Sequence, residues 1–254
     1  MRLERRLLRA FLFGALAWGI APGALADEAT TCRSDAMLVL DSSGSMAGTD
    51  MTSLTPHVAK VREALAAVVP DIAPRRNLGL LVYGPGKESK CDNIDLRLRP
   101  APNTAETILG EVNSVVPFGE TPLTDAVRDA AEVLEFRDKP SVVVLLTDGE
   151  ETCGGDPCRL ARQLKAEAAD LTIHVIGFKA TGAYTWLVPE KRAACMAEET
   201  GGLSLTAETR DELIRALRKT LSCPLFSALA PERSEVRAAL GSVRRRADHV
   251  SGKY

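Results

Sequence analysis

The sequence predicts a doubly wound α/β domain, in which a mostly parallel six-stranded sheet has one antiparallel edge strand and carries helices on both faces. Three observations lead to this prediction. Short apolar runs alternate along the chain with segments of helical periodicity. The run at residues 141–146 is almost continuous Val and Leu, which indicates a strand buried on both faces. Residues 94–98 alternate apolar and charged side chains, as expected of an edge strand with one solvated face.

Each element of this alternation has its own local signals. The predicted strands are residues 36–40, 78–83, 94–98, 141–146, 172–178 and 203–206. The predicted helices are residues 56–69, 104–115, 123–136, 157–169, 190–199 and 212–221. Thr104 is expected to cap its helix, and the pattern from Thr209 to Glu212 predicts a capping box before the last one. The predicted domain covers residues 33–222.

The N-terminus has the pattern of a secretory signal peptide over residues 1–26. A basic head precedes an apolar stretch at residues 11–20 and an Ala24-Leu25-Ala26 cleavage site. The alternative is an uncleaved anchor, although the apolar stretch is short for a bilayer span. No later segment is long and apolar enough to cross a membrane. We therefore expect a periplasmic or secreted protein.

The C-terminal residues 225–254 form a tail with a basic cluster at residues 244–246. One interpretation is a frayed helix followed by a disordered end. The other is a segment that docks to an acidic surface or to a membrane with anionic lipid. The chain as a whole has a formal net charge of −2 and only 4% aromatic residues, which argues against nucleic-acid binding.

The six cysteines all follow the predicted signal peptide. An even number in an exported chain favours disulfide bonds, and six cysteines allow fifteen pairings. The rival interpretation is a zinc site. The spacing from Cys153 to Cys158 is looser than a usual zinc knuckle, and no histidine pair accompanies it.

Three polar segments follow or precede predicted elements at positions that should share one edge of the sheet. Residues 41–46 follow the first strand, residues 119–123 open a helix, and residues 147–151 follow the most apolar strand. In a doubly wound fold, ligands bind beyond the carboxyl ends of the strands. We call these three segments the metal rim.

The metal rim carries aspartate carboxylates and serine or threonine hydroxyls, which are hard oxygen ligands. These ligands suit Mg²⁺ or Mn²⁺ better than zinc or copper. The D-x-S-x-S spacing can aim Asp41, Ser43 and Ser45 at one point, because alternate side chains of a tight loop can face the same way. The sequence therefore predicts a site for a divalent metal ion.

These segments resemble the metal-ion-dependent adhesion site of von Willebrand factor type A domains, over roughly residues 33–222. The matching pieces are residues 41–45, Thr121 within Thr-Pro-Leu, and Asp148 within Thr-Asp-Gly. The resemblance implies that Ser43 and Ser45 bind the metal directly and that Asp41 and Asp148 hold it mostly through water. It also implies that Thr121 is a switchable ligand, that an acidic side chain of a protein partner completes the site, and that the last helix can move on binding.

Residues 148–158, with Cys195 before Thr200-Gly201-Gly202, resemble exported bacterial members of that family more closely. In the family's topology, two cysteines lie on rim loops, two on successive helices, and two at the ends of the domain. The resemblance therefore implies the pairs Cys91–Cys153, Cys158–Cys195 and Cys32–Cys223.

The expected function is protein binding through the metal, as in adhesion, and not catalysis. Two alternatives remain: a module of an envelope complex docked by the basic tail, and a metal-assisted hydrolase, for which no free general base is evident. His57 is expected to be solvated, His174 to be a satisfied core or edge residue, and His249 to be solvated in the tail. Trp186 is expected to pack, with an exposed contact near the rim as the alternative. Glu150 and Glu151 either tune the charge of the site or are solvated.

Overall fold

The computed structural model describes residues 32–49, 54–86, 88, 90–178 and 191–223. The predicted signal peptide, the basic tail and Trp186 lie outside these residues. One six-stranded sheet forms the centre, in the order β3-β2-β1-β4-β5-β6. The strands are β1 Asp35–Asp41, β2 Leu78–Tyr83, β3 Ile94–Ala101, β4 Pro140–Thr147, β5 Asp170–Phe178 and β6 Ser204–Ala207. Every pairing is parallel except that of β2 with β3, which confirms the predicted sheet.

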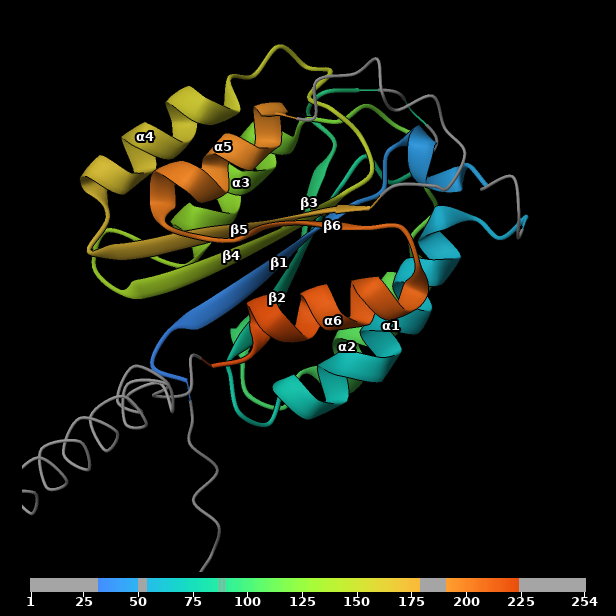
Figure 1. Ribbon diagram of the computed structural model, residues 1–254, viewed down its shortest axis with the longest axis horizontal. Coiled ribbons are helices and arrows are strands. Elements are labelled where there is room, and N and C mark those ends of the chain that lie inside the picture. The colour runs from blue at the N-terminus through green and yellow to red at the C-terminus, as the bar shows by residue number, and fades with distance from the viewer. Residues whose placement is uncertain (1–31, 50–53, 87, 89, 179–190, 224–254) are drawn as a thin grey trace, which may run out of the picture.

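Helices cover both faces of the sheet (Figure 1). They are α1 His57–Ile72, α2 Ala105–Ser114, α3 Leu123–Val133, α4 Pro157–Glu167, α5 Lys191–Thr200 and α6 Arg210–Leu221, with a short 3₁₀ helix η1 at Gly44–Ala47. Helices α1, α2 and α6 lie on one face, and α3, α4 and α5 lie on the other. The fold is therefore a three-layer α/β sandwich with β1 and β4 at its centre.

The alternation of side chains along the central strands divides the core in two. Leu38 and Leu40 of β1 pack under α1 and α6, whereas Met37 and Val39 point to the layer of α3, α4 and α5. All four side chains are fully buried. In a strand covered by helices on both faces, every side chain faces the core. This explains why β1 and β4 are continuous apolar runs.

Three local predictions need correction. Helix α3 ends at Val133 and not at residue 136, because Glu135 adopts a left-handed conformation with φ of 55° that ends the helix. The Thr104 side chain makes no cap; its hydroxyl donates to the carbonyl of Leu78 at 2.9 Å and ties α2 to β2. Helix α1 continues through Pro70 to Ile72, one turn further than predicted. The capping box at Thr209 and Glu212 is present.

Three disulfide bonds join Cys32 to Cys223, Cys91 to Cys153 and Cys158 to Cys195. These are the pairs that the family resemblance implied. Cys32–Cys223 closes a loop with a sequence separation of 191 residues. In the chain-entropy model, closing so long a loop stabilises the fold by about 4–5 kcal/mol.

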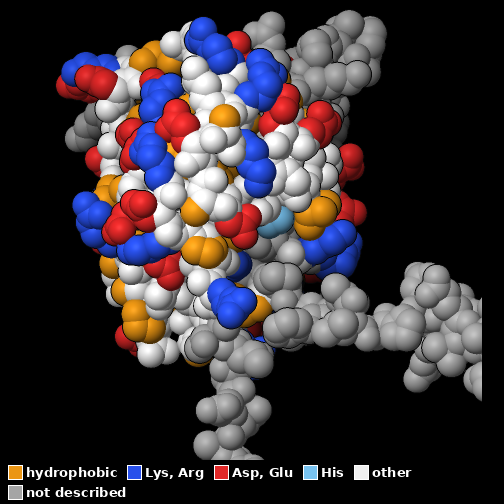
Figure 2. All heavy atoms as spheres, turned by 90° about the vertical axis from the view of Figure 1, so that its left-hand side faces the viewer, with side chains coloured by type: hydrophobic (Ala, Val, Ile, Leu, Met, Phe, Trp, Pro, Cys, Tyr) orange, Lys and Arg blue, Asp and Glu red, His pale blue; other side chains and the backbone are white. Residues whose placement is uncertain are grey.

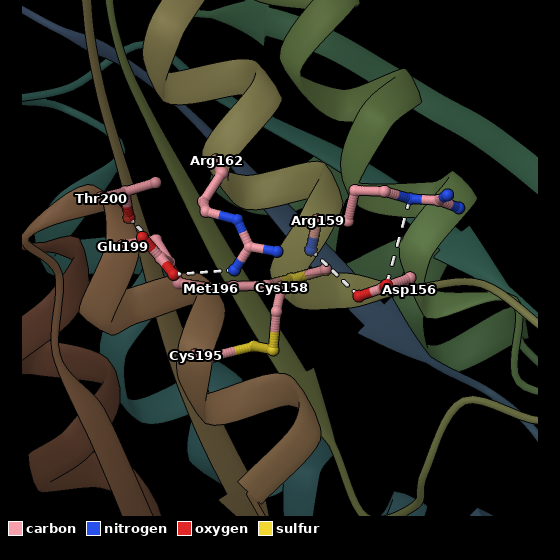
Figure 3. The surroundings of a disulfide bond; sticks show 8 residues. All are labelled: Asp156, Cys158, Arg159, Arg162, Cys195, Met196, Glu199 and Thr200. Atoms are coloured by element: carbon pink, nitrogen blue, oxygen red, sulfur yellow. Dashed lines mark hydrogen bonds and ion pairs between the residues drawn. A yellow bond between two sulfur atoms is a disulfide. The ribbon is translucent and has the colours of Figure 1, made fainter.

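The Cys158–Cys195 bond joins α4 to α5 on one side of the sheet (Figure 3). Beside it, Arg162 of α4 donates to Glu199 of α5 at 3.0 Å. On α5 itself, the Thr200 hydroxyl donates to the Met196 carbonyl at 2.7 Å. The bond therefore fixes two neighbouring helices on one face of the sheet.

The end of the domain at which β1 begins carries mixed charge. Figure 2 shows basic and acidic side chains interspersed over this end. Arg137 makes ion pairs with Glu132 and Glu167 there, close to the start of β4. Among the described residues, no helix has both the length and the apolar character needed to cross a membrane.

Candidate metal centre

The three segments of the metal rim lie together at the carboxyl ends of β1 and β4, held by backbone hydrogen bonds. The N–H of Ser42 donates to the Tyr83 carbonyl at 2.8 Å, which ties the first loop to β2. The N–H of Gly44 donates to the Gly119 carbonyl at 2.9 Å, and the N–H of Phe118 donates to the Ser42 carbonyl at 3.1 Å. These bonds lock two loops that lie far apart in sequence.

Gly84 at the end of β2 allows this close approach. Its φ is +71°, in the left-handed region that favours glycine. A Cβ atom there would lie 2.7 Å from the Glu120 carbonyl oxygen and 2.9 Å from the Ser43 Cα atom. A larger residue would therefore push the first two rim segments apart.

Asp41 is the last residue of β1 and is fully buried. Its Oδ1 atom accepts the backbone N–H of Ser43 at 2.8 Å, and its Oδ2 atom accepts the Thr147 hydroxyl at 2.6 Å. Burial and, next, the nearby carboxylate of Asp148 raise the pKa of Asp41, while the hydrogen bonds from Ser43 and Thr147 oppose this shift. Two carboxylates therefore lie close together, with one of them wholly removed from water.

Ser43, Ser45 and Asp148 form a chain of polar contacts beside Asp41. The hydroxyl oxygens of Ser43 and Ser45 are 2.9 Å apart. The Ser45 hydroxyl donates to the Oδ1 atom of Asp148 at 2.5 Å. The predicted D-x-S-x-S loop thus brings its two hydroxyls to the aspartate that follows β4.

Thr121 reaches the same place from the segment that precedes α3. A Cβ atom built on Gly149 would lie 3.8 Å from the Thr121 hydroxyl and 3.5 Å from the Ser45 hydroxyl, so both hydroxyls face this glycine. The N–H of Thr121 donates to the Thr152 hydroxyl at 2.9 Å, and the N–H of Thr152 donates to the Thr121 carbonyl at 3.2 Å. Thr152 therefore fixes the backbone of Thr121, a contact that sequence reasoning missed.

Glu151 has a structural role that the sequence left open. Its carboxylate accepts the N–H of Thr124 in the first turn of α3 and the N–H of Cys153, both at 2.8 Å. Cys153 is itself bonded to Cys91 of the loop between β2 and β3. The loop after β4 is therefore held both to α3 and to the loop between β2 and β3.

His57 is buried, contrary to the prediction that it is solvated. It is 9% exposed, and its Nδ1 atom lies 2.7 Å from the Oδ2 atom of Asp148. The sequence predicted a solvated side chain because His57 lies in the first turn of a helix. In the structure, this first turn of α1 lies against the metal rim, and the His57 ring contacts Asp148. The one available signal was its position at the start of the first helix after the D-x-S-x-S loop, at the carboxyl edge of the sheet.

His174 lies in β5, away from the rim, and is half-buried with a hydrogen-bond partner, within the predicted alternatives of a satisfied core or edge residue. Its Nδ1 atom accepts the N–H of Leu203 at 2.9 Å. Burial and the nearby Arg76 guanidinium lower the pKa of His174 to about 4. The ring is therefore neutral at pH 7 and serves as an acceptor.

The donor atoms at the rim fit a hard divalent cation. They are two carboxylates and three hydroxyls, from Asp41, Asp148, Ser43, Ser45 and Thr121, and oxygen ligands of this kind suit Mg²⁺ or Mn²⁺. In the described part of the chain, no group of three or more His, Cys, Asp or Glu side chains could hold a metal. A cation would also offset the repulsion between the two close carboxylates.

Exposed apolar side chains lie beside these polar groups. Among the described residues, four large apolar side chains are exposed, and they are Leu54, Leu96, Val116 and Phe118. Val116 and Phe118, which are 62% and 51% exposed, belong to the loop that leads into Thr121. We call these two residues the apolar strip. It adjoins the D-x-S-x-S loop, because the Phe118 N–H bonds to Ser42.

This combination of fold and rim defines a class of domain. Residues 35–195 match the family model of the von Willebrand factor type A domain, and the chain belongs to that family. Its sequence is 31% identical over 228 residues to the uncharacterized protein YwmD of Bacillus subtilis (strain 168). That similarity covers 85% of this chain and 96% of YwmD.

Solved structures share the fold at low sequence identity. A D319A mutant of the PilB minor pilin from Streptococcus sanguinis superposes with a TM-score of 0.57 at 14% identity, over 75% of this chain and 61% of that chain. Proximal thread matrix protein 1 from the mussel byssus, with a zinc-occupied MIDAS motif, gives a TM-score of 0.52 at 19% identity, over 76% of this chain and 48% of that chain. The chain therefore shares the fold of these two proteins.

Proposed function

We propose that this chain is an exported domain that binds a protein partner through a divalent metal, Mg²⁺ or Mn²⁺. The observation that carries the proposal is the convergence of Ser43, Ser45 and Thr121 hydroxyls with the carboxylates of Asp41 and Asp148. These five side chains would hold the metal. When bound, a divalent cation supplies positive charge and a coordination position that an external carboxylate can fill.

The protein's own residues prepare this site in two ways. The carboxylates of Asp41 and Asp148 supply negative charge at the bottom of the rim, where burial strengthens their attraction for a cation. Backbone bonds between the loops hold the hydroxyls in place before anything binds, so little ordering is required on binding. Few charged ligands in direct contact leave the cation attractive to a carboxylate from outside.

The apolar strip supports a protein partner over a small anion. An apolar surface around a small polar centre is typical of protein interfaces, in which aromatic side chains supply much of the binding energy. The likeness to a minor pilin supports the same class of function. We propose a partner whose acidic side chain enters the rim while neighbouring apolar groups cover Val116 and Phe118. We assign no catalytic role.

We also propose that the domain spans residues 33–222 and acts in the periplasm or outside the cell. Strand β6 pairs with β5 and helix α6 packs on α1, so both extend the domain beyond residue 195. Three disulfide bonds support an oxidising compartment. The leader at residues 1–26 would direct export. The tail at residues 225–254 would then be free to contact a membrane or an acidic surface.

A capture experiment tests this function. The exported chain is immobilised and exposed to an envelope extract of the source organism, with Mn²⁺ or with a chelator. We expect a protein that is retained only with metal by the wild type and is lost with Ser45→Ala. Ser204→Ala, an exposed serine on β6, is the matched control and should capture normally. Capture that survives both the chelator and Ser45→Ala would contradict the proposal.

A further inference from the structure

His57 occupies an unusual place for a histidine at the start of a helix. It is the first residue of α1, and its backbone N–H donates to the Gly48 carbonyl at 2.9 Å. Its ring packs edge-on against Phe178 at the end of β5, with the ring centroids 5.6 Å apart. The ring is therefore held between the first rim loop and the core.

The ring makes a polar contact with the carboxylate of Asp148. Its Nδ1 atom lies 2.7 Å from Oδ2, and the side chain of Asp148 is 2% exposed. Because an ionised carboxylate only accepts hydrogen bonds, Nδ1 is the donor. The other oxygen of the same carboxylate, Oδ1, accepts the Ser45 hydroxyl. His57 and Ser45 thus hold the two oxygens of Asp148 separately.

The environment of the second ring nitrogen, Nε2, indicates that the contact with Asp148 is the reason for a histidine at this position. Its Nε2 atom is buried and has no hydrogen-bond partner among the described residues. An unpaired buried nitrogen costs free energy that an apolar side chain packed against Phe178 would avoid. The bond to Asp148 is what distinguishes histidine from phenylalanine at this position.

We propose that His57 is a positioning residue of the metal centre. It fixes the carboxylate of Asp148 through Oδ2, so that Oδ1 stays directed at Ser45 and the rim. This inference rests on the proposed metal site, and it adds a residue that binds no metal itself. Partners that orient metal ligands in this way typically change metal affinity about 10- to 100-fold when they are removed.

Two substitutions separate the hydrogen bond from packing. His57→Phe keeps a ring against Phe178 but has no donor. His57→Asn keeps a donor near the position of Nδ1 but loses the ring. We expect His57→Phe to bind Mn²⁺ about 10- to 100-fold more weakly than the wild type. We expect His57→Asn to stay within about threefold of the wild type, because the donor to Asp148 is restored.

The measurement is calorimetric titration of the exported chain with Mn²⁺, together with thermal unfolding of each variant in chelator. Unfolding without metal shows whether each variant folds, and it does not depend on the metal site. His174→Gln is the control for loss of a half-buried, hydrogen-bonded histidine away from the rim. It should leave Mn²⁺ affinity unchanged, because Leu203 and not a rim residue contacts its ring.

The outcomes separate this inference from the proposed function. Wild-type binding that Asp41→Ala abolishes but His57→Phe leaves within threefold overturns the role of His57 alone. An equal loss in His57→Phe and His57→Asn, with both variants folded, also overturns it, because packing would then explain the effect. A wild type that binds no Mn²⁺ overturns the metal site and the inference together.

Discussion

The hydroxyl of Thr147 donates a hydrogen bond to the Oδ2 atom of Asp41 at 2.6 Å, and so joins the last residues of the neighbouring strands β4 and β1. The acceptor is a fully buried carboxylate. Hydrogen bonds to charged groups in such places are stronger than neutral ones. This bond therefore links the stability of the sheet to the position of a proposed metal ligand.

Thr147→Val removes this bond at nearly constant shape. We expect the free energy of unfolding to fall by about 1–3 kcal/mol, because the Asp41 carboxylate loses a donor and stays buried. Thr147→Ser keeps the hydroxyl and should lose much less. Urea denaturation of the metal-free protein measures both, and equal losses in the two variants would show that the methyl group matters instead.

The Cys91–Cys153 bond should affect the metal rim more than the Cys158–Cys195 bond does. Cys153 follows Thr152, which holds the backbone of Thr121, whereas Cys158–Cys195 joins two helices outside the rim. We expect the double variant Cys91→Ser/Cys153→Ser to bind Mn²⁺ more weakly. We expect Cys158→Ser/Cys195→Ser to lose about 2–4 kcal/mol of stability with Mn²⁺ affinity unchanged.

Calorimetric titration and denaturation of both double variants test this contrast. A change in Mn²⁺ affinity that is the same for both pairs would mean that the rim senses only global stability. If the folded Cys91→Ser/Cys153→Ser variant bound Mn²⁺ as tightly as the wild type, this disulfide would have no role in the metal rim.

The apolar strip should contribute to partner binding but not to metal binding. Phe118→Ser is expected to weaken partner binding at least tenfold, because exposed aromatic residues at an interface centre often contribute about 2 kcal/mol. Its Mn²⁺ affinity should equal that of the wild type. Leu96→Ser is the matched control, since Leu96 is an exposed apolar residue on the edge strand β3. If both serine variants bind the partner alike, the strip is not part of the interface.

We expect His174 to contribute part of the acid sensitivity of the fold. Its pKa is lowered from 6.5 to about 4. At pH values between 4 and 6.5, the unfolded chain therefore binds more protons than the folded chain. The free energy of unfolding is therefore highest above pH 6.5, falls progressively as the pH drops from 6.5 to about 4, and loses no more from this group below that. After allowance for partial exposure of the ring, we expect His174 to lower the free energy of unfolding by on the order of 2 kcal/mol across this pH range.

Comparison of the wild type with His174→Gln isolates this contribution, because Gln can accept the Leu203 N–H but does not titrate. The difference in unfolding free energy between pH 7.5 and 4.5 should be smaller in the variant. Parallel pH profiles for the two proteins would assign the acid sensitivity to other groups.

The sequence was informative wherever a pattern is local. Continuous apolar runs identified β1 and β4, since a strand buried on both faces admits little else, and alternation identified the edge strand β3. Helix α3 ended earlier than its periodicity predicted, because Phe136 is buried beyond a left-handed turn at Glu135 and continues the apolar pattern. A periodic apolar pattern indicates which residues are buried. It does not show where the helix ends, and here burial continues to Phe136 after the helix has ended.

The proposed ligands could be picked out in the sequence, whereas the side chains that support them could not. Asp41, Ser43 and Ser45 lie in one loop, so their spacing is visible in sequence. The contact of His57 with Asp148 spans 91 residues and depends on how α1 meets the rim. The bond between Thr152 and Thr121 likewise joins two loops. Only the packed fold brings such pairs together.

The most direct test of the account is titration of the exported chain with Mn²⁺, comparing the wild type with Asp41→Ala and the isosteric Asp41→Asn. Circular dichroism and thermal unfolding in chelator establish that each variant is folded. The account predicts one bound ion per wild-type chain and no measurable binding to either folded variant. A folded Asp41→Ala protein with wild-type affinity for Mn²⁺ would contradict the metal centre proposed here.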